Sequence, residues 1–223
     1  MHDKKRPYVI LNAAMSLDGK IATILGDSEF SSEEDWKRVH KLRSGMDAIM
    51  VGINTVIQDN PKLYVKYYET ARFWRIIIDS QSRTPLNAKL FQMDPEIYPV
   101  LIAVTNKAPR SKVEELIDRG AHVIRTGKGE KVDLRVVMTN LSKLGIKKVL
   151  LEGGGTLNFS MLKEKLVDEV IVAIAPVIVG GKNAITLVEG EGFELVKKGF
   201  NLQLEHIEQI DFNIVLYFRT KCS

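Results

Sequence analysis

The sequence predicts an α/β protein with a mostly parallel central sheet, flanking helices and a C-terminal antiparallel hairpin. Short apolar segments alternate with amphipathic ones along most of the 223 residues, which is typical of βαβ units. The C-terminal region differs, because segments 202–210 and 212–218 both have strand character and are joined almost directly, as in a hairpin. In the second segment, apolar residues occupy every other position: Phe212, Ile214, Leu216 and Phe218.

The individual elements follow from capping signals and periodicity. We expect a first buried strand over 7–15 and a first helix after Ser32, because three acidic residues follow this Ser and Gly45 supplies a stop. The other predicted strands cover 47–52, 74–79, 100–104, 121–125, 148–152 and 167–176. The other predicted helices cover 53–58, 111–119, 133–144 and 153–162.

Composition narrows the class of protein. With 45% hydrophobic and 27% charged residues, the chain has ample material for a core, and we expect one domain over 1–223. The net charge of +4 is spread along the chain, which argues against a nucleic-acid partner. The longest apolar run, 170–179, is shorter than the roughly 20 residues of a membrane span, so no membrane partner is expected. The single cysteine, Cys222, fits a cytoplasmic protein.

A glycine-rich turn is the most informative local feature. Segment 149–152 has strand character and runs into Gly153-Gly154-Gly155-Thr156. A helix that starts on such a turn presents free backbone N–H groups and its positive dipole end to an anion such as a pyrophosphate. The spacing matches neither a Rossmann nor a P-loop motif. A nucleotide site of another fold and an ordinary tight turn both stay open.

Two further turns follow predicted strands. Segment 14–20 places a polar turn after the first strand, where open α/β sheets bind ligands, although an ordinary Asp-Gly turn has the same pattern. Segment 51–61 combines a strand, a glycine turn and a short helix. Thr55 and Asp59 stand four residues apart there and share one helical face.

Together these segments resemble the reductase family of riboflavin biosynthesis, whose members have a dihydrofolate-reductase-like fold. The matching segments, in order, are 16–20, 51–61 with Leu63, 75–80, 151–156, and 166–169 leading into 175–176 and 180–181. The resemblance implies a homodimeric, NADPH-dependent reductase, with NADH possible. Its implied substrate is the phosphorylated pyrimidine 2,5-diamino-6-ribosylamino-4(3H)-pyrimidinone 5′-phosphate. The sequence lacks the Cys motif of the zinc deaminase domain found in bacterial members, so it resembles the stand-alone reductases of archaea and fungi.

The resemblance also implies particular site residues. The cofactor is expected to contact Ala14, Phe30, Thr55, Asp59, Ser80, Gly153, Gly154, Gly155 and Thr156. The substrate is expected to contact Ser28, Arg43, Leu63, Lys66 and Glu152. Arg43 and Lys66 are the expected phosphate partners, although Arg43 also fits a surface helix cation.

Three residues are candidates for catalysis. Glu152 is expected to hold the sugar hydroxyls or a cationic imine, whereas Lys20 and Asp59 are expected to handle protons. A solvated turn residue is the alternative for Lys20. No metal is expected, because the histidines lack acidic or cysteine neighbours at metal-binding spacing.

Two other functions stay open, a dihydrofolate reductase and a non-catalytic nucleotide-binding module. A dihydrofolate reductase binds its pterin through a carboxylate on an early helix, whereas the early helix here carries Trp36, Arg38, His40 and Arg43. The sequence does not settle NADPH against NADH, because it does not identify the partner of a cofactor 2′-phosphate; Arg83 and Lys107 are the candidates.

Overall fold

The computed structural model describes residues 6–221, so Cys222 lies outside the described residues. The chain forms two compact units. The first contains residues 6–8 and 40–150, and the second contains residues 9–39 and 151–221. Helix α1 (Glu33–Ser44) and strand β6 (Lys148–Leu151) contribute residues to both. The prediction of a single domain stays a prediction.

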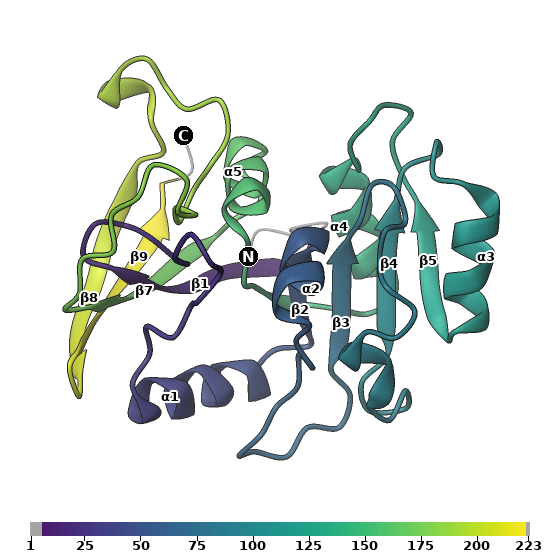
Figure 1. The fold of residues 1–223 in the computed structure, drawn as a ribbon, viewed down its shortest axis with the longest axis horizontal. Coiled ribbons are helices and arrows are strands. Elements are labelled where there is room, and N and C mark those ends of the chain that lie inside the picture. The colour runs from purple at the N-terminus through teal and green to yellow at the C-terminus, as the bar shows by residue number, and fades with distance from the viewer. Residues whose placement is uncertain (1–5, 222–223) are drawn as a thin grey trace. The chain divides into compact units, whose positions relative to one another are not determined.

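The first unit contains the parallel part of the fold. Strands β2 (Ala48–Gly52), β3 (Trp74–Ile78), β4 (Val100–Val104) and β5 (Ala121–Arg125) pair in parallel, in the order β5-β4-β3-β2-β6 (Figure 1). Helices α2 (Ile53–Asp59), α3 (Arg110–Asp118) and α4 (Leu134–Lys143) lie between these strands in sequence. Because the strands are parallel, the loops after β2, β3 and β4 leave the sheet at one edge.

A buried arginine fixes one loop of this unit. Arg75 on β3 is 1% exposed, and its guanidinium donates hydrogen bonds to the backbone carbonyls of Lys62, Leu90 and Tyr98. Burial lowers the pKa of Arg75 to about 10. The bond to Lys62 anchors the loop after α2, which contains several predicted substrate contacts.

The second unit contains the antiparallel part. Strand β1 (Tyr8–Ser16) pairs in parallel with β7 (Glu169–Ala175). Strand β9 (Asn213–Thr220) is antiparallel to β7, and β8 (Leu202–Ile210) is antiparallel to β9 (Figure 1). The order is β1-β7-β9-β8, and helix α5 (Gly155–Lys163) belongs to the same unit.

The predicted architecture is confirmed, and the predicted elements agree with the observed ones to within about two residues. Ser32 accepts a hydrogen bond from the Asp35 backbone at 3.1 Å, which confirms the predicted cap of α1. No helix within residues 6–221 combines the length and the apolar character that crossing a bilayer requires.

The last strand corrects one prediction. It starts at Asn213 and not at Phe212, because Asp211 adopts a positive φ of 53° and the chain turns there. Near this turn, the alternating apolar residues lie on the exposed face of the strand. Asn213 and Val215 are 0% exposed, whereas Phe212 and Ile214 are 48% and 39% exposed.

Candidate functional site

The glycine turn occupies the start of α5 in the second unit. Gly153 adopts a φ of +86°, which favours glycine, and Gly154 is the N-cap of the helix. Glu152 is half-buried and directly precedes the turn. The first-turn N–H groups of a helix have no acceptor within the helix, and Gly154 has no side chain to supply one. This end of α5 is therefore suited to bind an anion.

A distant segment packs tightly against this turn. A Cβ atom at position 155 would lie 2.5 Å from the Thr186 carbonyl oxygen and 2.8 Å from the Glu189 side chain, so only glycine fits. The Glu189 backbone donates a hydrogen bond to the Gly155 carbonyl at 3.1 Å. Thr156 donates another to the Glu189 carboxylate at 3.3 Å. Sequence reasoning missed Thr186 and Glu189, because no spacing signal connects residues some thirty positions apart.

Lys20 also contacts segment 184–189. The Lys20 ammonium donates a hydrogen bond to the Ala184 carbonyl at 3.2 Å, and Lys20 forms a β-bridge with Thr186. The Leu187 backbone donates to the Gly19 carbonyl at 3.1 Å. Segment 184–189 therefore joins the Lys20 turn and the glycine turn in one half of the predicted site. The Lys20 ammonium is anchored and not simply solvated.

Hydrogen bonds of Asp18 also stabilise the Lys20 turn. Its carboxylate accepts hydrogen bonds from the Ser16 hydroxyl at 2.7 Å and from the backbones of Val179 and Gly180 at 3.0 and 2.7 Å. The Ser16 bond and the Val179 bond lower the pKa of Asp18 from 3.8 to about 2.

The remaining predicted residues of the second unit lie on β1 and on the loop before α1. Ala14 is half-exposed on β1, opposite Ala173 of β7. Ser28 is exposed, whereas Phe30 is 6% exposed. Most of the Phe30 ring is thus packed against protein.

In the first unit, Ser80 follows β3 at the carboxyl edge of the sheet. Its carbonyl accepts a hydrogen bond from the Thr105 backbone at 3.1 Å, and its hydroxyl accepts one from the Val132 backbone at 3.2 Å. The preceding Asp79 is buried and accepts two hydrogen bonds from Thr84, at 2.7 and 2.8 Å. These bonds fix the loop that contains Ser80 and Arg83.

Arg83 links this loop to the start of α2. Its guanidinium donates a hydrogen bond to the Asn54 side chain at 3.0 Å, next to the half-buried Thr55. The structure therefore brings the segments of Thr55 and Ser80 together. Asp59 lies at the end of α2, where burial of its carboxyl raises its pKa. Lys107, in contrast, forms an ion pair with Glu130.

Three predicted substrate residues converge at the end of α1. Arg43 donates a hydrogen bond to the Tyr64 carbonyl at 3.0 Å, and the Lys66 backbone donates one to His40 at 3.1 Å. Leu63, directly before Tyr64, is buried with a left-handed φ of 52°, a conformation that non-glycine residues rarely adopt. Arg43 is 7% exposed, so the alternative of a surface cation is wrong.

Within residues 6–221, no cluster of His, Cys, Asp and Glu side chains is arranged to bind a metal. The predicted site residues carry hydroxyls, backbone N–H groups, cations and the carboxyls of Glu152 and Asp59. Such groups are suited to phosphorylated organic ligands.

The fold places the protein in a known class. The dihydrofolate reductase of Enterococcus faecalis superposes with a TM-score of 0.53 at 8% identity, over 96% of this chain and 97% of that one. This likeness shows a dihydrofolate-reductase-like α/β fold and nothing finer.

Residues 7–216 match the RibD C-terminal domain, and the chain belongs to this family. It is 47% identical to the 2,5-diamino-6-ribosylamino-4(3H)-pyrimidinone 5′-phosphate reductase of Methanothermobacter thermautotrophicus, over 97% of this chain and 99% of that relative. RibD of Acinetobacter baumannii superposes with a TM-score of 0.84 at 29% identity. The match covers 98% of this chain but 59% of that longer protein. The protein is thus an oxidoreductase of this family, as the sequence predicted.

The Asp18 contacts predict a pH-dependent stability. Asp18→Asn is expected to lower the urea midpoint of unfolding at pH 7, because the amide cannot accept all the bonds of the carboxylate. A carboxyl whose pKa is lowered on folding stabilises the protein fully above the unfolded pKa of about 3.8, and this effect is lost as the pH falls toward 2. The midpoints of wild type and variant should therefore converge below about pH 4. The exposed Asp118→Asn serves as control, and a gap that stays constant from pH 7 to pH 3 would contradict the prediction.

Proposed function

We propose that this protein catalyses the NADPH-dependent reduction of 2,5-diamino-6-ribosylamino-4(3H)-pyrimidinone 5′-phosphate to its ribitylamino product in riboflavin biosynthesis. The observation that carries the proposal is the glycine turn at the start of α5, which has no side-chain cap. This turn and Lys20 both contact segment 184–189. The near full-length relative with that name supports the choice of substrate.

The cofactor residues fit a dinucleotide. The N–H groups at Gly155 and Thr156 would hold its pyrophosphate, and Thr55 and Ser80 are the further cofactor contacts that the family resemblance implies. When bound, the cofactor supplies a hydride from its nicotinamide ring. NADPH is proposed over NADH because Arg83 has a neutral partner, Asn54, and so keeps its charge available for a 2′-phosphate. Lys107 is a poorer choice, since Glu130 already neutralises it.

The substrate residues fit a phosphorylated sugar. Arg43 and Lys66 would hold the phosphate, with Ser28 and Leu63 beside the rest of the substrate. In the reaction, the ribosylamine ring opens to an imine; C1′ accepts the hydride and the imine nitrogen gains a proton. Glu152 would hold the sugar hydroxyls or the cationic imine. The raised pKa of Asp59 and the anchored ammonium of Lys20 suit them to proton handling.

A homodimer through the C-terminal hairpin belongs to the same proposal. Strand β8 is the edge strand of its unit, and apolar side chains on the hairpin are 38–54% exposed, namely Leu202, Leu204, Ile207, Phe212 and Ile214. An exposed edge with such an apolar surface favours association with another chain. Segment 170–179 is the other candidate contact; it is mostly buried over 170–175, whereas Val177 and Ile178 are 43% and 71% exposed. A cytoplasmic location stays a prediction from the sequence.

The activity can be tested by following NADPH absorbance after addition of the ribosylamino-pyrimidine phosphate. We expect oxidation of one NADPH per ribitylamino product formed, and a slower rate at equal NADH concentration. Dihydrofolate, run in parallel, should give no turnover. Turnover of dihydrofolate alone would identify a dihydrofolate reductase, and binding without turnover of either compound would identify a nucleotide-binding module.

Glu152→Gln is expected to lower kcat by on the order of 100-fold, because the neutral amide cannot stabilise developing positive charge. NADPH affinity, measured by fluorescence titration, should stay within about twofold of wild type, since the change spares the helix N–H groups. The control is the exposed Glu96→Gln. Unchanged turnover in Glu152→Gln would remove this residue from the mechanism.

The proposed dimer predicts a mass of two chains by static light scattering at micromolar concentration. Ile207→Lys, which places a charge on the exposed hairpin surface, should shift the mass to that of one chain. Leu25→Lys is the control, because Leu25 is 93% exposed outside the hairpin. A wild-type mass of one chain, or a dimer that Ile207→Lys leaves intact, would contradict this interface.

A further inference from the structure

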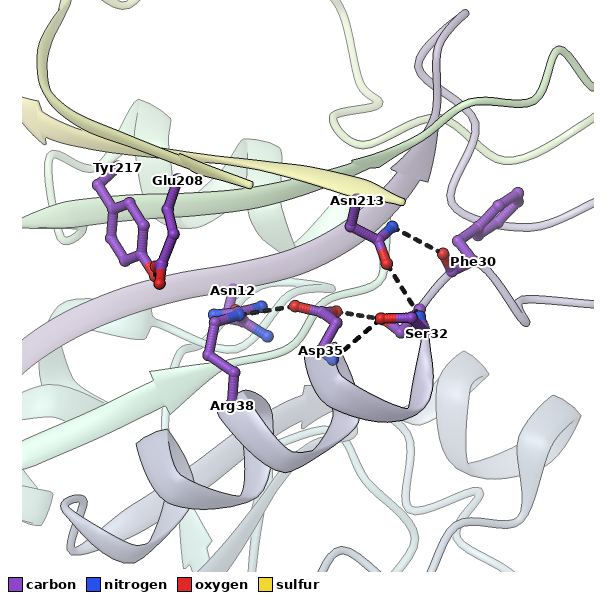
Figure 2. Close-up of polar contacts among 9 residues, drawn as sticks. Asn12, Phe30, Ser32, Asp35, Arg38, Glu208, Asn213 and Tyr217 are labelled. Carbon is purple, nitrogen blue, oxygen red and sulfur yellow. Dashed lines mark hydrogen bonds and ion pairs between the residues drawn. The ribbon is translucent and has the colours of Figure 1, made fainter. Parts of the chain in front are cut away.

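The side chain of Asn213 binds the backbone of the loop before α1. Its Nδ2 atom donates a hydrogen bond to the Phe30 carbonyl at 3.0 Å, and its Oδ1 atom accepts one from the Ser32 N–H at 2.9 Å. Figure 2 shows the amide between these two backbone groups. One side chain thus satisfies both backbone groups that flank Ser31, as a neighbouring strand would.

This pairing is buried and demands an asparagine. Asn213 is 0% exposed, and Phe30 and Ser32 are 6% and 4% exposed. Without the amide, a backbone donor and a backbone acceptor would both lose their partner away from water, which is costly. An ionised aspartate offers acceptors alone and would place negative charge against the Phe30 carbonyl oxygen.

Apart from the Asn213 contacts, the hydrogen bonds described for this loop join residues that are close in sequence. Segment 26–32 forms no helix or strand, and Asp27, Ser28 and Glu29 are exposed. At its start, the backbones of Thr23 and Asp27 are hydrogen-bonded at 2.8 Å. At its end, Asn213 fixes the backbone at Phe30 and Ser32. The amide is therefore the contact that joins the end of this loop to the hairpin.

The tether continues into a polar network (Figure 2). Ser31 donates a hydrogen bond to the Asp35 carboxylate at 2.6 Å, and Asp35 is 0% exposed. Arg38 donates from Nε to Asp35 at 2.7 Å and from Nη1 to Asn12 at 3.2 Å. The residues that the network connects thus lie on the β9 end of the hairpin, the loop, helix α1 and strand β1.

We propose that Asn213 is a positioning residue for the reductase reaction. It sets the backbone of the segment that contains Ser28 and Phe30, which the family resemblance implies as substrate and cofactor contacts, and the inference rests on the proposed function. Asn213 itself contacts the loop and not the reactants. Its loss should therefore weaken binding of both reactants more than it slows the chemical step.

The test compares wild type, Asn213→Asp and the exposed control Asn201→Asp, which adds the same charge at the base of the hairpin. At pH 7.5 we expect Asn213→Asp to raise KM for NADPH and for the ribosylamino-pyrimidine phosphate, with a loss in kcat/KM of roughly 10- to 100-fold. The value of kcat should stay within a few-fold. Hydrogen exchange of peptides covering residues 28–33 should accelerate in Asn213→Asp and not in the control.

A pH series supplies a readout that general destabilisation would not move. A protonated aspartic acid has the shape of the asparagine amide and again offers one donor and one acceptor. We therefore compare the KM of Asn213→Asp with the wild-type KM at each pH. The ratio of the two values should fall toward one as the pH is lowered. If Asn213→Asp does not fold, the uncharged Asn213→Ser should show the same division between KM and kcat.

The outcomes separate the two proposals. An active wild type with unchanged KM values in the Asn213 variants would overturn the positioning role alone. Unchanged hydrogen exchange over residues 28–33, or a loss confined to kcat, would overturn it as well. A wild type that does not reduce the ribosylamino-pyrimidine phosphate would overturn the proposed function, and the positioning role with it.

Discussion

The second unit is organised by the absence of a side chain at position 155. Because Gly155 has no Cβ, the Thr186 carbonyl and the Glu189 side chain come closer to the start of α5 than any other residue would allow. The approaching segment also binds the Lys20 ammonium through Ala184. A single steric constraint therefore brings one segment against both the start of α5 and Lys20, although these residues are far apart in the sequence.

The first unit positions its residues by other means. Its strands are parallel, so Ser80 and the start of α2 leave the sheet at one edge, and the Arg83–Asn54 bond connects them. The loop after α2 is anchored by Arg75, whose buried guanidinium donates hydrogen bonds to backbone carbonyls. Breaking such contacts would leave a buried cation without acceptors, which is costly, and one of them lies directly before Leu63 with its left-handed φ.

Local signals in the sequence predicted most of the fold but less of the site. The cap at Ser32 and the helix start at the glycine turn depend on neighbouring residues, so both were predictable. The contacts of Thr186, Glu189 and Asn213 join segments that are 30 to 180 positions apart, and no periodicity encodes them. Arg43, Leu63 and Lys66 were grouped in one predicted site by family resemblance. Their spacing alone does not predict that this loop packs against a helix.

The inner face of β9 near the turn follows from the role of the first residues of the strand. A strand with alternating apolar side chains is normally expected to bury them, yet near the turn the buried positions are Asn213 and Val215. The polar Asn213 occupies the inner face because the loop before α1 lacks a strand partner and needs a donor and an acceptor together. The apolar side chains of Phe212 and Ile214 are then left on the outer face. The inward position of Asn213, which fixes the loop, therefore leaves an apolar surface on the hairpin. A second copy of the chain would cover this surface in the proposed dimer.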